Sequence, residues 1–207
     1  MMLDDRVAML DVLWSAWRQQ GETLTDERWD RPTRLGTWNV RSLYAHAAGW
    51  PLGFSNLLGR IQDVEPTHPT AAALLRDFNG PDGIAKRGAE QVAATARERA
   101  DSSSAAQMIE QFASTGPEAI AKARQLGPVV VDYFGLAMLR LDEVASIGIL
   151  EATVHLLDLQ RALDLPPDVP ADGLAHTAAV LAEMAPPVDF IEVATGRSTV
   201  ELFPVLT

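Results

Sequence analysis

The sequence contains no cysteine among its 207 residues. This absence excludes disulfide bonds, metal sites built on thiolates and a sulfur nucleophile supplied by the chain itself. Any chemistry that uses sulfur must therefore take the sulfur atom from a separate molecule.

The sequence also lacks long apolar runs. It has no stretch of about 18 uncharged apolar residues, the length that a membrane-spanning helix needs. Its first residues, MMLDDR, do not show the basic segment and apolar core of a secretory signal peptide. We therefore expect a cytoplasmic protein with no membrane partner.

Positive charge is scarce as well. Lys and Arg number 17 against 28 Asp and Glu, which gives a net charge of −11. A chain of this charge repels nucleic-acid phosphates and anionic lipids, and the sequence shows no local basic patch. We expect neither nucleic acid nor a membrane surface as a partner.

The composition that is present, with 47% hydrophobic and 22% charged residues, is that of a packed globular domain. Apolar residues recur at spacings of three and four in several segments, which predicts an all-α fold. The predicted helices cover residues 4–20, from 38 onward, 84–100, 104–126, 142–163 and 171–185. The apolar stretch 129–138 is too short and too interrupted by glycine to assign.

The end of the sequence has a different pattern. Residues 190–193 and 199–205 are two β-prone runs on either side of Thr195 and Gly196. They predict a small hairpin within residues 186–207. We assign this extension to the same domain as the helical bundle of residues 1–185.

The predicted helix 142–163 carries the side chains that could bind a ligand or take part in a reaction. Between Val144 and Leu159 it is apolar on nearly every side, and only Glu151, His155 and Asp158 can ionise. Offsets of four and three place these side chains on one face. Because unpaired burial of such groups is costly, each of them needs a partner.

Two kinds of partner satisfy this need. Glu151 and His155 can hydrogen-bond each other inside the bundle, while Asp158 reaches a helix end or an arginine such as Arg161. Alternatively, Glu151 and His155 bind a divalent metal, for which carboxylate and imidazole are suitable ligands. The pattern leaves both open, and a metal needs a third ligand.

His46 is the best candidate for that third ligand. It lies at the edge of the apolar stripe of the second predicted helix, and residues 45 and 47–49 are small enough to let another helix approach. A single histidine in such a place is also a common packing residue. His68, in a polar loop, and His176, off an apolar stripe, are not assigned to the site.

Two segments resemble one known family. Residues 35–49, LGTWNVRSLYAHAAG, resemble its signature Gly-Trp-(Ser/Thr)-Val-(Arg/Lys)-(Asp/Glu)-Leu-x-x-His. Residues 151–163, EATVHLLDLQRAL, resemble its second signature, Glu-x-x-x-His-x-x-Asp-(Leu/Ile)-x-x-Ala-Leu. The family is the DinB-like, mycothiol-dependent maleylpyruvate isomerase family with a metal-binding N-terminal domain. Two motifs in the right order are more specific than either alone.

The resemblance implies a DinB-like four-helix bundle with short extra helices and, in this chain, the small C-terminal β extension. It implies that His46, Glu151 and His155 bind Zn²⁺, or another divalent metal such as Ni²⁺, and that Asp158 orients a ligand or bound solvent. An open coordination position would take a low-molecular-weight thiol, mycothiol or a similar one. The expected reaction is S-transfer to a small electrophile or its thiol-assisted isomerisation.

Two other functions are compatible with the same residues. One is a non-catalytic helical bundle that binds a metal or a small ligand. The other is a zinc-hydroxide hydrolase, since the open position can also hold water. A homodimer is compatible with the sequence as well.

Overall fold

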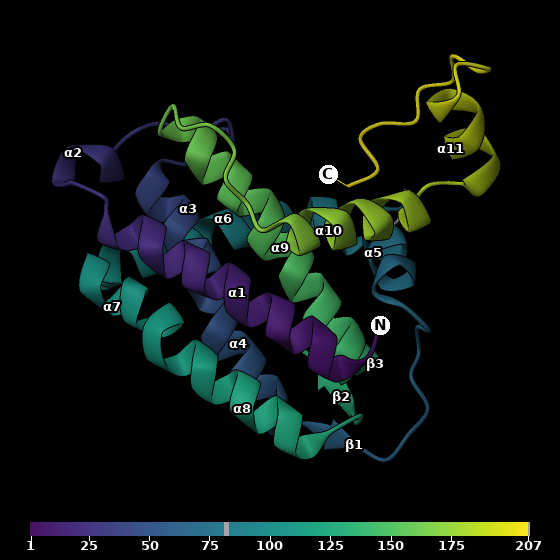
Figure 1. Cartoon of the computed structure of the whole chain (residues 1–207), viewed down its shortest axis with the longest axis horizontal. Coiled ribbons are helices and arrows are strands. Elements are labelled where there is room, and N and C mark those ends of the chain that lie inside the picture. The colour runs from purple at the N-terminus through teal and green to yellow at the C-terminus, as the bar shows by residue number, and fades with distance from the viewer. Residues whose placement is uncertain (81–82, 207) are drawn as a thin grey trace.

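The computed structural model describes residues 1–80 and 83–206 of the chain, and within them the fold is an all-α bundle, as predicted. Four helical segments close the bundle, with α1 against α9 and α8, and α3 and α4 completing the ring (Figure 1). These segments are α1 (Leu3–Glu22), α3 and α4 (Val40–Ala47 and Gly49–Leu57), α7, η1 and α8 (Ala105–Glu110, Gln111–Thr115 and Gly116–Leu126), and α9 (Leu141–Ala162).

Shorter or peripheral helices surround this bundle. The long helix α6 packs on the outer side of α3, and α10 packs on α9. The outer helices are α2 (Asp26–Trp29), α5 (Ala71–Asn79), α6 (Ile84–Ser102), α10 (Ala171–Met184) and α11 (Pro187–Ala194).

The contact between α1 and α9 forms the centre of the core. Val7, Leu10, Leu13 and Trp17 repeat at helical spacing along one face of α1 and are fully buried. The indole Nε1 of Trp17 also donates a hydrogen bond of 3.0 Å to the carbonyl oxygen of Ala152 on α9. Because Ala152 follows Glu151 directly, this contact fixes the turn of α9 that carries the candidate site.

A small sheet covers one end of the bundle. Its strands β1 (Ile61–Gln62), β2 (Val130–Tyr133) and β3 (Ala137–Arg140) pair antiparallel in that order. Thus most of the stretch that the sequence left unassigned is a hairpin. Its turn contains Phe134 and Gly135, both with positive φ, and β3 leads directly into α9.

The predicted C-terminal hairpin is wrong. The first β-prone run lies in the helix α11, and no strand occurs among residues 195–206. Pro187 suits the first turn of a helix, where its missing N–H costs nothing. A two-stranded hairpin needs a surface to pack on, but α11 stands away from the bundle and has no buried residue (Figure 1).

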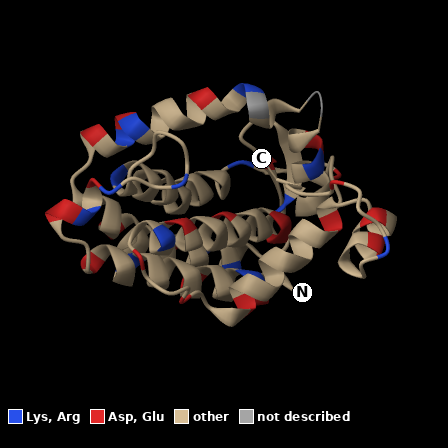
Figure 2. Cartoon of the chain, turned by 90° about the horizontal axis from the view of Figure 1, so that it is seen from above, with Lys and Arg blue, Asp and Glu red and all other residues tan. Residues whose placement is uncertain are grey.

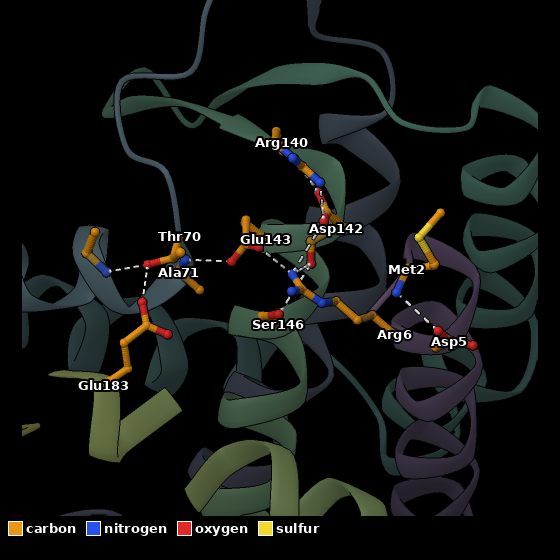
Figure 3. Close-up of polar contacts among 11 residues, drawn as sticks. Met2, Asp5, Arg6, Thr70, Ala71, Arg140, Asp142, Glu143, Ser146 and Glu183 are labelled. Carbon is orange, nitrogen blue, oxygen red and sulfur yellow. Dashed lines mark hydrogen bonds and ion pairs between the residues drawn. The ribbon is translucent and has the colours of Figure 1, made fainter. Parts of the chain in front are cut away.

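Ion pairs tie the N-terminal ends of α1, α5 and α9 together. Figure 3 shows Arg6 of α1 reaching α9, where its Nη1 lies 2.6 Å from Glu143 Oε1 and donates to the carbonyl oxygen of Asp142. The other carboxylate oxygen of Glu143 accepts a hydrogen bond of 2.7 Å from the backbone N–H of Ala71, the first residue of α5. One buried carboxylate therefore holds three helices.

Charged residues of both signs are spread along the helices, as Figure 2 shows. Within the described part of the chain, no helix is both long enough and apolar enough to cross a membrane. The cytoplasmic location stays a prediction.

Candidate metal centre

The packing of α3 against α9 brings together the three residues that the sequence selected. His46 comes from α3, while Glu151 and His155 lie one turn apart on α9. One ligand atom from each lies within 4.8 Å of the others. The two imidazole rings are nearly perpendicular, at 87°, with their centroids 5.0 Å apart. The three side chains thus converge, and their role as metal ligands stays a prediction.

The separations between these atoms fit a shared metal ion. Nε2 of His46 and Nε2 of His155 each lie 3.5 Å from Oε2 of Glu151. Metal–ligand bonds of about 2.0–2.2 Å in a tetrahedral site place neighbouring ligand atoms about 3.3 Å apart. Charge-assisted hydrogen bonds are shorter, at about 2.7–2.9 Å. Two imidazole nitrogens and one carboxylate oxygen are also a donor set that zinc accepts, so these residues fit the ion.

Asp158 lies behind His155. Its Oδ2 is 3.0 Å from Nδ1 of His155, which leaves Nε2 of the ring facing Glu151. The carboxylate is buried, with 3% of the side chain exposed. A carboxylate on the second ring nitrogen is the usual way in which proteins fix the tautomer and orientation of a metal-binding histidine.

The second partner of Asp158 is a residue that the sequence analysis missed. Nε of Arg34 donates a hydrogen bond of 2.6 Å to Oδ1 of Asp158. Arg161, the partner considered from the sequence, is exposed and is not a partner of Asp158. Arg34 lies in the loop between α2 and α3, where no helical periodicity marks it. Its position just before the first family-like segment was the one signal available.

The same loop also contacts the other histidine. The ring of Trp38 packs edge-on against His46, with centroids 5.2 Å apart. Short backbone hydrogen bonds close the loop on itself, including Trp38 N–H to the carbonyl oxygen of Leu35 and Thr33 N–H to that of Trp38. Gly36, with φ of +61°, provides the left-handed conformation that this tight turn needs.

The electrostatics of the cluster favour a carboxylate beside an imidazolium. Burial would raise the pKa of Glu151, but hydrogen bonds and charges from His155 and His46 outweigh it and lower that pKa far below its usual range. Burial would lower the pKa of His155, but hydrogen bonds to Asp158 and Glu151 outweigh it and raise the pKa to about 9. The pKa of Asp158 is lowered by His155 and Arg34, which outweigh the opposite effect of its burial.

The cluster is reachable from solvent on one side. The side chains of His46, Glu151 and His155 are 20%, 22% and 18% exposed, so each keeps a limited opening. On its inner side Glu151 is backed by aromatic rings, among them Trp17 and Trp50. Three converging side chains that keep this exposure differ from the closed four-ligand sites of structural zinc.

The remaining histidines lie elsewhere. Nε2 of His68 is 3.1 Å from Oδ2 of Asp77 at the surface. His176 lines a hollow between α1 and α10, and its buried Nε2 has no partner among the described residues. Burial lowers the pKa of His176. Neither residue is part of the metal-ligand cluster, in agreement with the sequence analysis.

Comparison with known proteins gives one match. The sequence model of the mycothiol maleylpyruvate isomerase N-terminal domain matches residues 10–160, which include the first family-like segment, most of the second and all of the converging side chains. Searches of curated proteins and of solved structures found no match. The chain belongs to the family of the mycothiol maleylpyruvate isomerase N-terminal domain, a DinB-like family.

Proposed function

We propose that this protein binds one zinc ion, or a similar divalent ion, through His46, Glu151 and His155. It would use the ion with a low-molecular-weight thiol such as mycothiol for S-transfer to a small electrophile or for its thiol-assisted isomerisation. The observation that carries the proposal is the pair of 3.5 Å separations between the two imidazole nitrogens and one oxygen of Glu151.

Each residue of the site has a defined task in this proposal. His46 and His155 supply neutral nitrogen ligands, and Glu151 supplies a carboxylate that offsets the charge of the ion. Asp158 holds the ring of His155 through Nδ1. Bound there, zinc would lower the pKa of a thiol and make the thiolate available near neutral pH.

Two further observations support the use of an external thiol. The chain has no cysteine, so its own residues offer no sulfur nucleophile. The family to which it belongs bears the name of mycothiol. The partial exposure of the three ligands leaves a side from which a small thiol and a small electrophile can approach.

Metal content tests the first half of the proposal. Protein purified without a His-tag should contain about one divalent ion per chain by native mass spectrometry, and His46→Ala and His155→Ala should lose it. His68→Ala is the matched control, because it removes a histidine–carboxylate contact outside the cluster. Equal metal content in the wild type and in His46→Ala would contradict the site.

Thiol dependence tests the second half. Zinc-loaded protein should turn over maleylpyruvate or a chloro-aromatic electrophile only with an added thiol, chosen from mycothiol, bacillithiol and glutathione, and Glu151→Ala should be inactive. With cobalt in place of zinc, thiol binding should produce a sulfur-to-metal charge-transfer band. Equal turnover without thiol would indicate a metal-hydroxide hydrolase instead. Absence of both turnover and thiol binding would favour the non-catalytic metal-binding bundle.

A further inference from the structure

A continuous chain of polar contacts runs from the surface to the metal-ligand cluster. It begins at Arg34, whose Nε is 2.6 Å from Oδ1 of Asp158, and continues from Oδ2 of Asp158 to Nδ1 of His155 over 3.0 Å. The burial changes sharply along it, since Arg34 is 59% exposed and Asp158 is 3% exposed. The exposed arginine therefore reaches a ligand histidine through one buried carboxylate.

Asp158 needs both partners to hold one orientation. A carboxylate has two acceptor oxygens, and a contact on each of them restricts its rotation more than a contact on one. Among the described residues, His155 and Arg34 are the ion-pair partners of Asp158. The orientation of His155 thus depends on a residue that does not touch it.

The position of Arg34 is itself defined by its loop. Thr33, next to it, donates through N–H and Oγ1 to the carbonyl oxygen of Trp38, and the bridge between Pro32 and Asn39 closes the loop. An arginine in a freely moving segment could not set a ligand geometry. Here the backbone around Arg34 is tied down on both sides.

We propose that Arg34 is a positioning residue of the metal centre: by holding Asp158, it fixes the ring of His155 with Nε2 turned toward Glu151 and His46. The proposal rests on the proposed function, because it concerns the same ligands. It makes residues 34–38 part of the site, since this turn supports both His155, through Arg34, and His46, through Trp38.

A nearby pair provides a matched control. Arg31 of the same loop forms an ion pair with Asp164, which lies just beyond the C-terminal end of α9. This pair also joins the loop to that end of the helix, but Asp164 does not contact a ligand residue. If Arg34 served only to attach the loop, the loss of Arg31 and the loss of Arg34 should have similar effects.

The test measures zinc affinity by competition with a chelator. Arg34→Ala should weaken binding roughly 10-fold, the lower end of the range for residues that support metal ligands. Arg34→Lys should restore part of the loss, and Arg31→Ala should bind zinc as the wild type does. Urea unfolding of the metal-free variants separates positioning from folding, because Arg34→Ala should remain fully folded under the conditions of the zinc assay.

A double substitution tests whether Arg34 acts through Asp158. Asp158→Asn should retain the metal with affinity reduced by roughly 10 to 100-fold, and adding Arg34→Ala to it should cause no further loss. Additive losses, or an Arg34→Ala affinity equal to that of Arg31→Ala, would overturn the proposal. Complete loss of metal in Asp158→Asn would also overturn it, because Asp158 would then be a ligand.

A measurement without metal keeps this proposal separate from the proposed function. ¹⁵N NMR of metal-free protein above pH 9, where the His155 ring is neutral, should show the proton on Nδ1 in the wild type and in Arg31→Ala, and a mixture of tautomers in Arg34→Ala. An unchanged ring in Arg34→Ala would overturn the positioning role. If the wild type binds no zinc, the proposed function fails, while this measurement still decides the role of Arg34.

Discussion

At the scale of single residues, the candidate site depends on how three partly buried groups share charge. Glu151 lies in a helix whose other nearby residues are almost all apolar, so an isolated carboxylate would be costly there. The two histidines supply the compensation, and a metal ion would supply more of it. His155 faces carboxylates through both of its ring nitrogens, Glu151 on one side and Asp158 on the other.

The raised pKa of His155 predicts how metal binding depends on pH. A protonated imidazole cannot bind a metal, so zinc must displace the proton that Asp158 and Glu151 hold on His155 up to about pH 9. Apparent zinc affinity should therefore rise by about 10-fold per pH unit between neutral pH and pH 9, then level off. Chelator competition across this range would measure it, with proton release in weak buffer as a second readout.

The stability of the metal-free protein should depend on pH in the opposite direction to zinc affinity. The folded-state pKa of His155 is raised above its unfolded value of 6.5, so its contribution to stability is fully present below that pH and is lost as the pH rises through about 9. The metal-induced increase in Tm should consequently grow with pH. A zinc affinity that stays constant from neutral pH to pH 9 would show that His155 is not protonated in this range. Asp158→Asn should make the affinity level off at a lower pH.

At the scale of elements, α9 combines two tasks. Its middle carries Glu151 and His155, two of the proposed metal ligands, and its N-terminal turn carries Asp142 and Glu143, whose charges suit the positive end of a helix dipole. Arg6 of α1 and the start of α5 both contact Glu143 (Figure 3). The direction in which α9 crosses the bundle is therefore fixed at its beginning by charges and at its middle by the contact of Trp17 with Ala152.

The network at the start of α9 leads to a prediction about stability. Glu143→Ala should lower the free energy of unfolding by about 3 kcal/mol, because it removes the closest carboxylate partner of Arg6 and leaves the backbone N–H of Ala71 without its acceptor. Arg140→Ala is the control: Arg140 also pairs with Asp142 but is exposed, so its loss should cost less than about 1 kcal/mol. Urea unfolding would measure both losses of stability. Similar losses for the two variants would show that Glu143 does not hold the three helices together.

At the scale of the whole molecule, the site belongs to the bundle and not to the C-terminal extension. The proposed ligands lie on α3 and α9, and the loop that contacts Asp158 and His46 connects α2 to α3. The family match also ends at residue 160. Beyond α10, the helix α11 has no buried residue, and Val205 and Leu206 are partly buried residues that return to the core.

This arrangement predicts the effect of removing residues 187–207. Zinc affinity should stay unchanged, while the free energy of unfolding should fall by about 1–2 kcal/mol, since only a small apolar area is lost from the core. Replacing Val205 and Leu206 together with serine in the full chain should reproduce the loss of stability. A large decrease in zinc affinity after truncation would show that the extension helps to form the site.

The sequence by itself determined the main helices of the bundle and one side of the site. Helical periodicity is a local property, so α1 and α9 could be predicted from the spacing of their apolar residues, and the offset of four put Glu151 and His155 on one face. The small residues around His46 made it the candidate third ligand, and the first family-like segment supported that choice. The absence of cysteine fixed the kind of chemistry that the chain cannot provide alone.

Tertiary structure decided which distant segments meet. His46 and Glu151 are 105 residues apart, and only the packing of α3 on α9 brings them to 3.5 Å. The contact of Arg34 with Asp158 was invisible because a loop side chain obeys no period. The C-terminal residues were misread for a related reason: their β propensity is realised only against a surface, and α11 has none to pair on. Propensity and spacing act within a few residues, whereas burial and partner choice depend on the whole fold.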